Sequence, residues 1–342
     1  MKTLADERVT DCGSEDRVVP LVAAPMPPRR EPAAFSIFHE PWWLDIATGG
    51  NWAMAKVMHG NQLMGQLPYC STRKGAFRIS HLPPLTHTLG PVVQSLGLDG
   101  PREQSHRQTV TSALIEQLPH FDSFYQPLDA RIEDALAFSL HGFTVSVRYT
   151  FQISPERTIC QVWDTMHSKT RNVIRSAEKN LTVAPIATPA EFLRFYEANL
   201  SGRSRQNAYG RVMNQLVNAF VERQTGHLLG AYSTDGRLVA AIGLVWDQHA
   251  MYYLLSSRED KAHSGAISLL IWKAIQQAIE RKLTFDVDGF YDRGTCKFLE
   301  GLGGTLKQRL CVERAGTMFS VARVLRQRFM RDARSGFSAL SR

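Results

Sequence analysis

One order of predicted secondary structure occurs twice along this chain, and it constrains the fold more than any other sequence feature. In residues 35–151 and again in residues 163–312, helical segments precede three strands, after which a helix, a strand, a helix and a strand follow. Apolar alternation between turn sequences such as Thr234-Asp235-Gly236 indicates the strands, among them residues 238–246. Predicted helices include residues 41–48, residues 163–179 and a helix capped by Asp129 that ends at Leu140, and residues 97–107 are a predicted polar loop. The halves share no evident sequence identity, so the repeat is one of architecture. It predicts an α/β fold with mixed sheets and two similar lobes.

Changes in composition suggest where these lobes begin and end. Residues 1–34 contain five prolines and little apolar sequence, which predicts a flexible leader. We expect an N-terminal lobe over residues 35–153, a C-terminal lobe over residues 154–315 and a basic helix or tail over residues 316–342. A length of 342 residues is sufficient for two domains with separate cores.

Composition and charge limit the classes of partner. Hydrophobic residues make up 44% of the chain and charged residues 21%, as in globular proteins. No apolar run is long enough to span a membrane, and the N-terminus lacks the pattern of a secretory signal, so we expect a cytoplasmic protein without a transmembrane segment. The net charge of +8 favours an anionic partner, such as a nucleotide cofactor, tRNA or an anionic lipid surface.

Several chemistries are disfavoured by missing motifs. The five cysteines show no CxxC spacing, and the histidines do not cluster at ligand spacing, so we expect no metal. Patterns typical of zinc hydrolases, serine hydrolases and P-loop enzymes do not occur. Cys296 is better explained as a buried structural thiol than as a nucleophile.

Two segments resemble a known family. Residues 169–179, KTRNVIRSAEK, are similar to a K-x-R-x-x-I-R-x-A segment of Fem-like aminoacyltransferases, and residues 227–304 resemble a GNAT lobe ending in FDVDG and FLEGLGG. The resemblance implies two tandem GNAT-like acyltransferase lobes. The implied reaction is acyl or aminoacyl transfer to an amine of a sugar, amino acid or peptide, in envelope or polysaccharide metabolism. Many members read F-K-x-G-F-G where this chain has Leu299, with Lys297 two positions earlier, so a nucleotide-linked cell-wall acceptor does not follow.

The resemblance further implies a donor site between two strands. Residues 251–256 and 284–288 should part near Ser256 and Asp288, leaving a slot for a carrier-bound carbonyl. The helix that follows should offer its N-terminus to a phosphate. The expected donor-binding residues are Ser256, Arg258, His263, Ser264 and Gly265. We expect acyl-CoA as the donor before aminoacyl-tRNA, and the alternative is an ordinary N-capped helix after a solvated turn.

Asp286 and Asp288 are the candidate catalytic residues. They alternate with apolar residues, so both carboxylates project from one face of the strand, where they could bind the acceptor ammonium or act as general base. The alternative is that Asp288-Gly289 only makes a turn. Tyr291 is a candidate acid for the leaving group, although a packing role fits a tyrosine there as well.

A basic helix face is the candidate substrate-binding surface. Helical spacing aligns Arg171 and Arg175, with Lys169 at the start of the segment. The residues expected to contact substrate are Lys169, Arg171, Arg175, Tyr252 and Lys297. A solvated basic face would have the same pattern. A module that has lost catalysis and binds a nucleotide-sugar, RNA or protein is the rival hypothesis.

The tail is expected to form a second basic helix over residues 317–334. Met318, Val321 and Leu325 lie on one face at helical spacing, and five arginines lie on the other. We expect the apolar face to dock on the body of the protein. Contact with an anionic membrane or RNA is the alternative.

Overall fold

The computed structural model describes residues 35–202, 207, 209–288 and 292–325. The first half, residues 35–153, begins with a short 3-10 helix, Ile37–His39. Its further elements are α1 (Pro41–Thr48), β1 (Trp52–His59), β2 (Gln62–Cys70), β3 (Thr72–Lys74), β4 (Phe77–Ser80), β5 (Val92–Val93), α2 (Gly100–Glu116), β6 (Ser123–Pro127), α3 (Leu136–Leu140) and β7 (Thr144–Ile153).

The second half, residues 154–315, has the predicted order with two additional elements. These elements are α4 (Ile159–Thr165), α5 (Ser168–Glu178), β8 (Leu181–Pro185), α6 (Pro189–Gly202), α7 (Gly210–Glu222), β9 (Gly226–Ser233), β10 (Leu238–Trp246), β11 (Ala250–Arg258), α8 (Ala266–Glu280), β12 (Thr284–Asp286), α9 (Arg293–Glu300) and β13 (Thr305–Ala315). The fold is thus the expected mixed α/β class.

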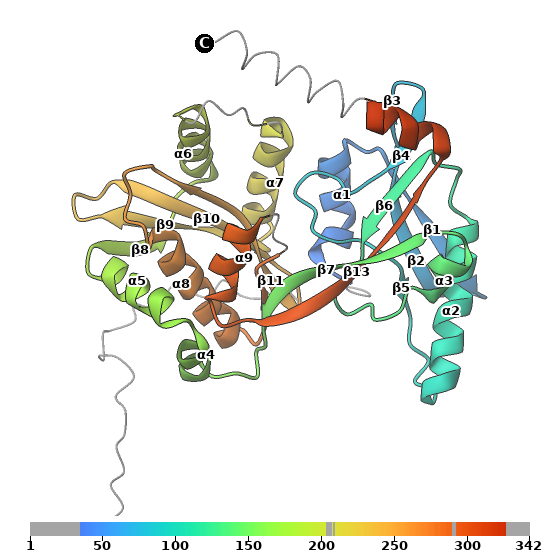
Figure 1. The fold of residues 1–342 in the computed structure, drawn as a ribbon, viewed down its shortest axis with the longest axis horizontal. Helices are drawn as coiled ribbons and strands as arrows, with labels where there is room; N and C mark the ends of the chain where they lie inside the picture. The colour runs from blue at the N-terminus through green and yellow to red at the C-terminus, as the bar shows by residue number, and fades with distance from the viewer. Residues whose placement is uncertain (1–34, 203–206, 208, 289–291, 326–342) are drawn as a thin grey trace, which may run out of the picture.

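The two halves exchange their last strands. Within the described residues, a ten-stranded sheet has the order β3-β4-β6-β13-β7-β12-β11-β10-β9-β8, and a smaller sheet has the order β1-β2-β5. Each half contains one parallel pair, β4 with β6 and β11 with β12. The strand β13 pairs with β6 of the first half, whereas β7 pairs with β12 of the second half. Figure 1 shows β7 and β13 running across the middle, between the two halves. One sheet therefore joins both.

Two helical layers bury the second half of the sheet. The strand β10 is almost entirely apolar and buried, as expected for a strand covered on both faces. Alternate residues of β10 belong to two separate hydrophobic cores, one on each face of the sheet. One core is formed with α4, α5, α8 and α9, and the other with α1, α6 and α7. A third core lies beneath α2 and α3 in the first half.

Helix starts account for two corrections to the sequence prediction. The predicted polar loop over residues 97–107 is largely the beginning of α2, because the Asp99 carboxylate accepts a hydrogen bond from the Arg102 N–H at 3.2 Å. Asp129 was expected to cap a helix that ends at Leu140. Its carboxylate instead binds the Arg131 side chain at 2.9 Å, and α3 begins only at Leu136.

The second half also departs locally from the prediction. The helix expected over residues 163–179 is divided into α4 and α5, because Met166 is extended and buried between them. The strand β8, which follows α5, was not predicted. None of the helices in the described ranges combines the length and apolar character required to cross a membrane.

The tail helix differs from its expected docking mode. It is helical from residue 317 to residue 325, where the described chain ends. Phe319 packs against Phe77, with ring centroids 5.3 Å apart. Met318 is 79% exposed, and Val321 and Leu325 are also exposed. The apolar face predicted to face inward therefore faces away from the described chain.

Candidate functional site

The strands β11 and β12 part at the expected end of the sheet. They pair from Ala250 and Thr284 only as far as Tyr252 and Asp286. The strand β11 continues to Arg258 along β10, with a register shift near Leu254. No other strand of the described chain pairs with the edge of β11 that faces the gap. Separation thus begins slightly earlier than the predicted position near Ser256 and Asp288.

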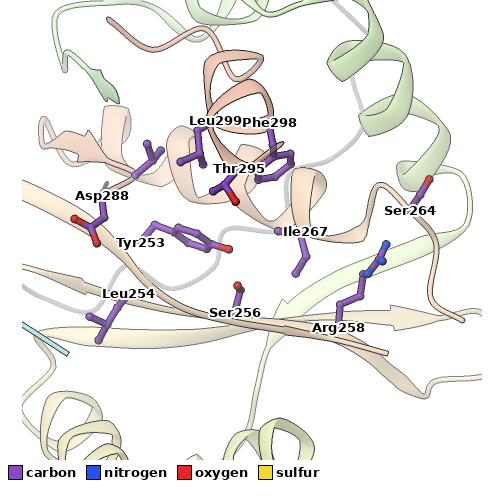
Figure 2. A pocket seen from close by; sticks show the side chains of 11 residues that line it. Tyr253, Leu254, Ser256, Arg258, Ser264, Ile267, Asp288, Thr295, Phe298 and Leu299 are labelled. Atoms are coloured by element: carbon purple, nitrogen blue, oxygen red, sulfur yellow. The ribbon is translucent and has the colours of Figure 1, made fainter. Parts of the chain in front are cut away.

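A pocket of about 460 Å³ occupies the gap between these strands. It extends from Asp288 at one end to Arg258 and Ser264 at the other, and the Tyr253 side chain points into it (Figure 2). Its full lining comprises Tyr253, Leu254, Ser256, Arg258, Ser264, Ile267, Val287, Asp288, Thr295, Phe298 and Leu299. The slot is therefore open, with charged side chains at its ends and an apolar wall formed by α8 and α9.

The start of α8 contributes to the pocket in a different manner from that expected. The N-cap is Gly265, and neither His263 nor Ser264 caps the helix with its side chain. The His263 Nδ1 accepts a hydrogen bond from the Gly265 N–H at 3.0 Å. A Cβ atom on Gly265 would lie 2.6 Å from the Val173 carbonyl oxygen, so this glycine permits α8 to pack against α5. Of His263, Ser264 and Gly265, only Ser264 lines the pocket.

Asp286 is buried within a saturated hydrogen-bond network. Its carboxylate accepts hydrogen bonds from Gln152 Nε2 at 2.7 Å, Thr150 Oγ1 at 2.7 Å and Arg309 Nη2 at 2.8 Å. Burial by itself would raise the pKa of Asp286, but the Arg309 charge and these hydrogen bonds lower it. The residue is 1% exposed. The Asp286 carboxylate, predicted to be catalytic, is thus held by three side chains and does not line the pocket.

Asp288 is the carboxylate that reaches the pocket. Its backbone is in the left-handed region, with φ of 65°, and its N–H donates to the Asp286 carboxylate at 2.8 Å. The Asp288 Oδ1 accepts a hydrogen bond from Arg309 Nη1 at 2.6 Å, and His87 Nε2 lies 3.4 Å from Oδ2. Asp286 therefore fixes the turn that directs Asp288 toward the pocket.

Two members of this cluster, Arg309 and His87, were missed from the sequence. Arg309 is 5% exposed in the middle of β13, and His87 comes from the segment between β4 and β5 of the first half. Charge at the centre of a predicted strand was the only available signal for Arg309. For His87 there was none, because its contact with Asp288 joins residues about 200 positions apart.

Tyr253 takes the pocket position that was predicted for Tyr252. Tyr252 is buried, and its O–H donates to the Asp247 carboxylate at 3.1 Å, so its side chain faces the core formed with α1 and α7. Tyr253, on the opposite face of β11, lines the pocket. Burial raises the pKa of Tyr253 to about 12, which keeps its hydroxyl protonated at neutral pH.

The predicted basic surface lies outside the pocket lining. Lys169 and Arg175 are exposed on α5, and the Arg175 guanidinium lies 5.2 Å from the Trp163 ring centroid. The Arg171 side chain donates to the Asp164 carbonyl at 3.0 Å. Lys297 is exposed on α9 and is not a pocket residue, unlike Phe298 and Leu299 that follow it. These basic residues are therefore not gathered with Asp288 in one site.

Two further predictions concern Tyr291 and Cys296. Tyr291 lies outside the described residues. Cys296 is half-buried and packs against the core beside α8. In the described part of the chain, no three His, Cys, Asp or Glu side chains are grouped so that they could hold a metal ion.

Comparison with known proteins identifies a domain that contains most of the pocket lining. Residues 168–293 match the family model of an acetyltransferase (GNAT) domain. A FemX crystal structure superposes with a TM-score of 0.58 at 11% sequence identity, over 79% of this chain and 90% of FemX. A protein of unknown function from Bacteroides thetaiotaomicron gives a TM-score of 0.53 at 12% identity, over 80% of this chain and 88% of that protein. No curated protein sequence matches the chain significantly.

These comparisons confirm the resemblance that the sequence indicated. Residues 168–293 match a GNAT domain, and the 79% of the chain that superposes shares the fold of FemX. At such low identity the structural likeness establishes the fold, and the chemistry has to be argued from the pocket.

Proposed function

We propose that this chain transfers an acyl or aminoacyl group from a carrier to an amine in the pocket between β11 and β12. The parting of these two strands at Tyr252 and Asp286, with an open pocket in the gap, carries the proposal. In this proposal the lobes correspond to residues 35–153 and 154–315, with β7 and β13 exchanged between them. A cytoplasmic location belongs to the proposal, because both kinds of donor are made there.

The donor would enter from the end of the pocket at Arg258 and Ser264. The N–H groups in the first turn of α8 have no partners within the helix, and together with Arg258 they suit a phosphate of the carrier. Ile267 and Leu299 provide an apolar wall for the acyl chain. This wall supports acyl-CoA as the first choice. Aminoacyl-tRNA is the second, since its backbone could also contact the exposed basic face of α5.

The acceptor amine would bind at the other end, beside Asp288. The carboxylate would hold the ammonium form and accept its proton, directly or through water. The amine nitrogen would then attack the carbonyl carbon. The bond from that carbon to sulfur in acyl-CoA, or to the ester oxygen in aminoacyl-tRNA, would break. The protonated Tyr253 hydroxyl, which lines the pocket, would give its proton to the departing thiolate or alkoxide and regain one from the nitrogen of the new amide. A sugar, amino acid or peptide amine fits this scheme, including one from envelope or polysaccharide metabolism.

Donor binding provides the first test. We expect acetyl-CoA or a longer acyl-CoA to stabilise the chain in a thermal shift, because a ligand of the folded state stabilises it by mass action. Arg258→Ala should weaken acyl-CoA binding about tenfold, equivalent to the loss of ~1.4 kcal/mol. Arg237→Ala is the matched control, because Arg237 is an exposed arginine outside the pocket. No stabilisation by any acyl-CoA or by charged tRNA would refute transfer and favour a non-catalytic binding module.

The exposed tail helix supports a second element of the proposal, peripheral contact with an anionic membrane. Met318, Val321 and Leu325 form an exposed apolar stripe. Burial lowers the pKa of His81, and the positive charges of Lys74 on β3 and of Arg323 on the tail helix lower it further, so both basic side chains act on the same histidine. The sequence beyond residue 325 adds four arginines by residue 334. An apolar stripe flanked by basic side chains suits the interface of an anionic bilayer better than it suits RNA.

A vesicle-binding assay tests the membrane contact independently of acyl transfer. We expect the chain to co-sediment with phosphatidylglycerol vesicles and much less with phosphatidylcholine vesicles, because each basic residue near an anionic surface contributes ~1 kcal/mol. Met318→Ser should reduce binding, whereas Met58→Ser, at an exposed methionine of β1, should not. Equal binding to both vesicle types, or no binding, would refute the membrane contact.

A further inference from the structure

The segment between β4 and β5 brings a histidine of the first half against the pocket of the second half. This segment is fixed on both sides of His87. The Trp43 Nε1–H donates to Thr86 Oγ1 at 3.0 Å, and the Leu89 N–H donates to the Pro127 carbonyl at 3.0 Å. The His87 side chain is 8% exposed, and its ring centroid lies 4.9 Å from that of Phe38. The imidazole therefore has one well-defined position.

His87 and Arg309 contact different oxygens of the same carboxylate. Arg309 Nη1 lies 2.6 Å from Asp288 Oδ1, while His87 Nε2 lies 3.4 Å from Asp288 Oδ2. The Asp288 side chain remains 24% exposed where it lines the pocket. The Arg309 contact comes from β13 and the His87 contact from the first half. Together they fix the orientation of the carboxylate, and with it the edge that faces the pocket.

The charge balance of this cluster depends on a neutral imidazole. Burial lowers the pKa of His87; Asp288 and Asp286 oppose this effect, and Arg309 adds to it. The remaining titratable ring packed against it is that of Tyr252, at 6.1 Å. With neutral His87, one guanidinium faces two carboxylates, which leaves a net charge of −1 on the cluster. A protonated His87 would cancel this charge and remove the attraction for an ammonium group.

The hydrogen-bond pattern indicates which nitrogen carries the proton. His87 Nδ1 is buried and has no hydrogen-bond partner among the described residues. A proton on Nε2 can point to the Asp288 carboxylate, whereas a proton on Nδ1 would be left without an acceptor. The Nε2–H tautomer therefore turns its proton toward the Asp288 carboxylate oxygen 3.4 Å away without adding positive charge.

We propose that His87 is a positioning residue of the transfer site, which holds the Asp288 carboxylate with its open edge toward the acceptor amine. The inference rests on the proposed function for the identity of that amine. It gives the first half a direct part in acceptor binding, although the pocket itself lies in the second half.

Steady-state kinetics of acyl-CoA-dependent transfer to a panel of primary amines tests the proposal. We expect His87→Leu to raise the KM for the acceptor about tenfold, with the Kd for acetyl-CoA unchanged. His87→Gln should restore the KM to within about threefold of the original, because its Nε2–H can reach the same oxygen. His39→Gln, at a buried histidine that contacts Gly90 instead of the pocket, is the control. An unchanged acceptor KM in His87→Leu, or no rescue by glutamine, overturns the proposal.

A readout without turnover separates this inference from the proposed function. In ¹⁵N-imidazole NMR of the full chain, we expect His87 as the Nε2–H tautomer, and Asp288→Asn should lower its pKa further because the carboxylate raises it. Absence of transfer with every donor, together with this NMR result, would refute the reaction and retain the contact. A His87 pKa that does not respond to Asp288→Asn would overturn the positioning role, whatever the activity.

Discussion

Substitution of Asp286 should lower mainly stability, whereas substitution of Asp288 should lower mainly activity, although the two residues lie two positions apart and contact the same arginine. Asp286→Asn removes a buried charge facing Arg309, which is 5% exposed. Breaking a buried ion pair by removing one partner costs ~3–5 kcal/mol. Asp288 still contacts the guanidinium in this variant, so the lower end, ~3 kcal/mol of unfolding free energy, is expected.

Asp288→Asn should have the opposite pattern. The Asp288 side chain is 24% exposed, so its ion pair is partly screened and its loss should cost only ~1 kcal/mol. Asparagine tolerates the left-handed backbone that this position requires. Removal of the carboxylate that receives the amine proton should nevertheless slow transfer by a factor of ~100 or more.

Urea unfolding and a thiol-release assay with acyl-CoA measure the two effects on the same preparations. Asp235→Asn, at an exposed aspartate in the turn between β9 and β10, is the control for both. Full stability of Asp286→Asn would refute the assignment of this residue to the buried network. Full activity of Asp288→Asn would refute its role in the reaction.

Three further predictions concern Gly265 and Tyr253 at the site and the buried His39 outside it. Gly265→Val should lower the unfolding free energy by ~2 kcal/mol and weaken acetyl-CoA binding, because the added Cβ would meet the Val173 carbonyl oxygen. Gly100→Ala is the control and should change neither quantity, because there is open space around the added methyl group. Burial lowers the pKa of His39 from 6.5 to about 4, so the unfolded chain binds this proton at a higher pH than the folded chain does. The free energy of unfolding, measured with urea, should therefore fall by ~3 kcal/mol as pH falls from 6.5 to 4. His39→Gln should remove this contribution to the pH dependence. Tyr253→Phe should reduce kcat by a factor of ~10 without changing the Kd for acetyl-CoA, and an unchanged kcat would exclude proton donation by Tyr253.

Elements with strong local signals could be predicted from the sequence alone. The bounds of α1 are as predicted, since Pro41 opens the helix and Gly49 ends it in the left-handed conformation. The bounds of β10 also agree, because its apolar residues are continuous between two turns. Asp99 and Asp129 show where local signals fail. Both are suitable N-cap residues, but the Asp129 carboxylate binds the side chain of Arg131, two positions along the chain, and a capping pattern does not reveal this competing contact.

The candidate site was predictable only in part for a related reason. The position of the slot followed from the order of strands and the resemblance, and the structure has the two strands parting there. The roles of Asp286 and Asp288 depend on which of them meets Arg309 in the interior. That contact depends on the pairing of β7 with β13, for which the sequence contains no local signal.

The exchange of last strands also determines when this protein can fold during synthesis. The strand β6 lacks its neighbour β13 until residue 315 has left the ribosome, although β6 itself is complete by residue 127. Domains otherwise tend to fold in order as the chain emerges. Here the first half must wait for the second, and a chain that terminates early would expose the edges of both β6 and β7, which are ready templates for aggregation.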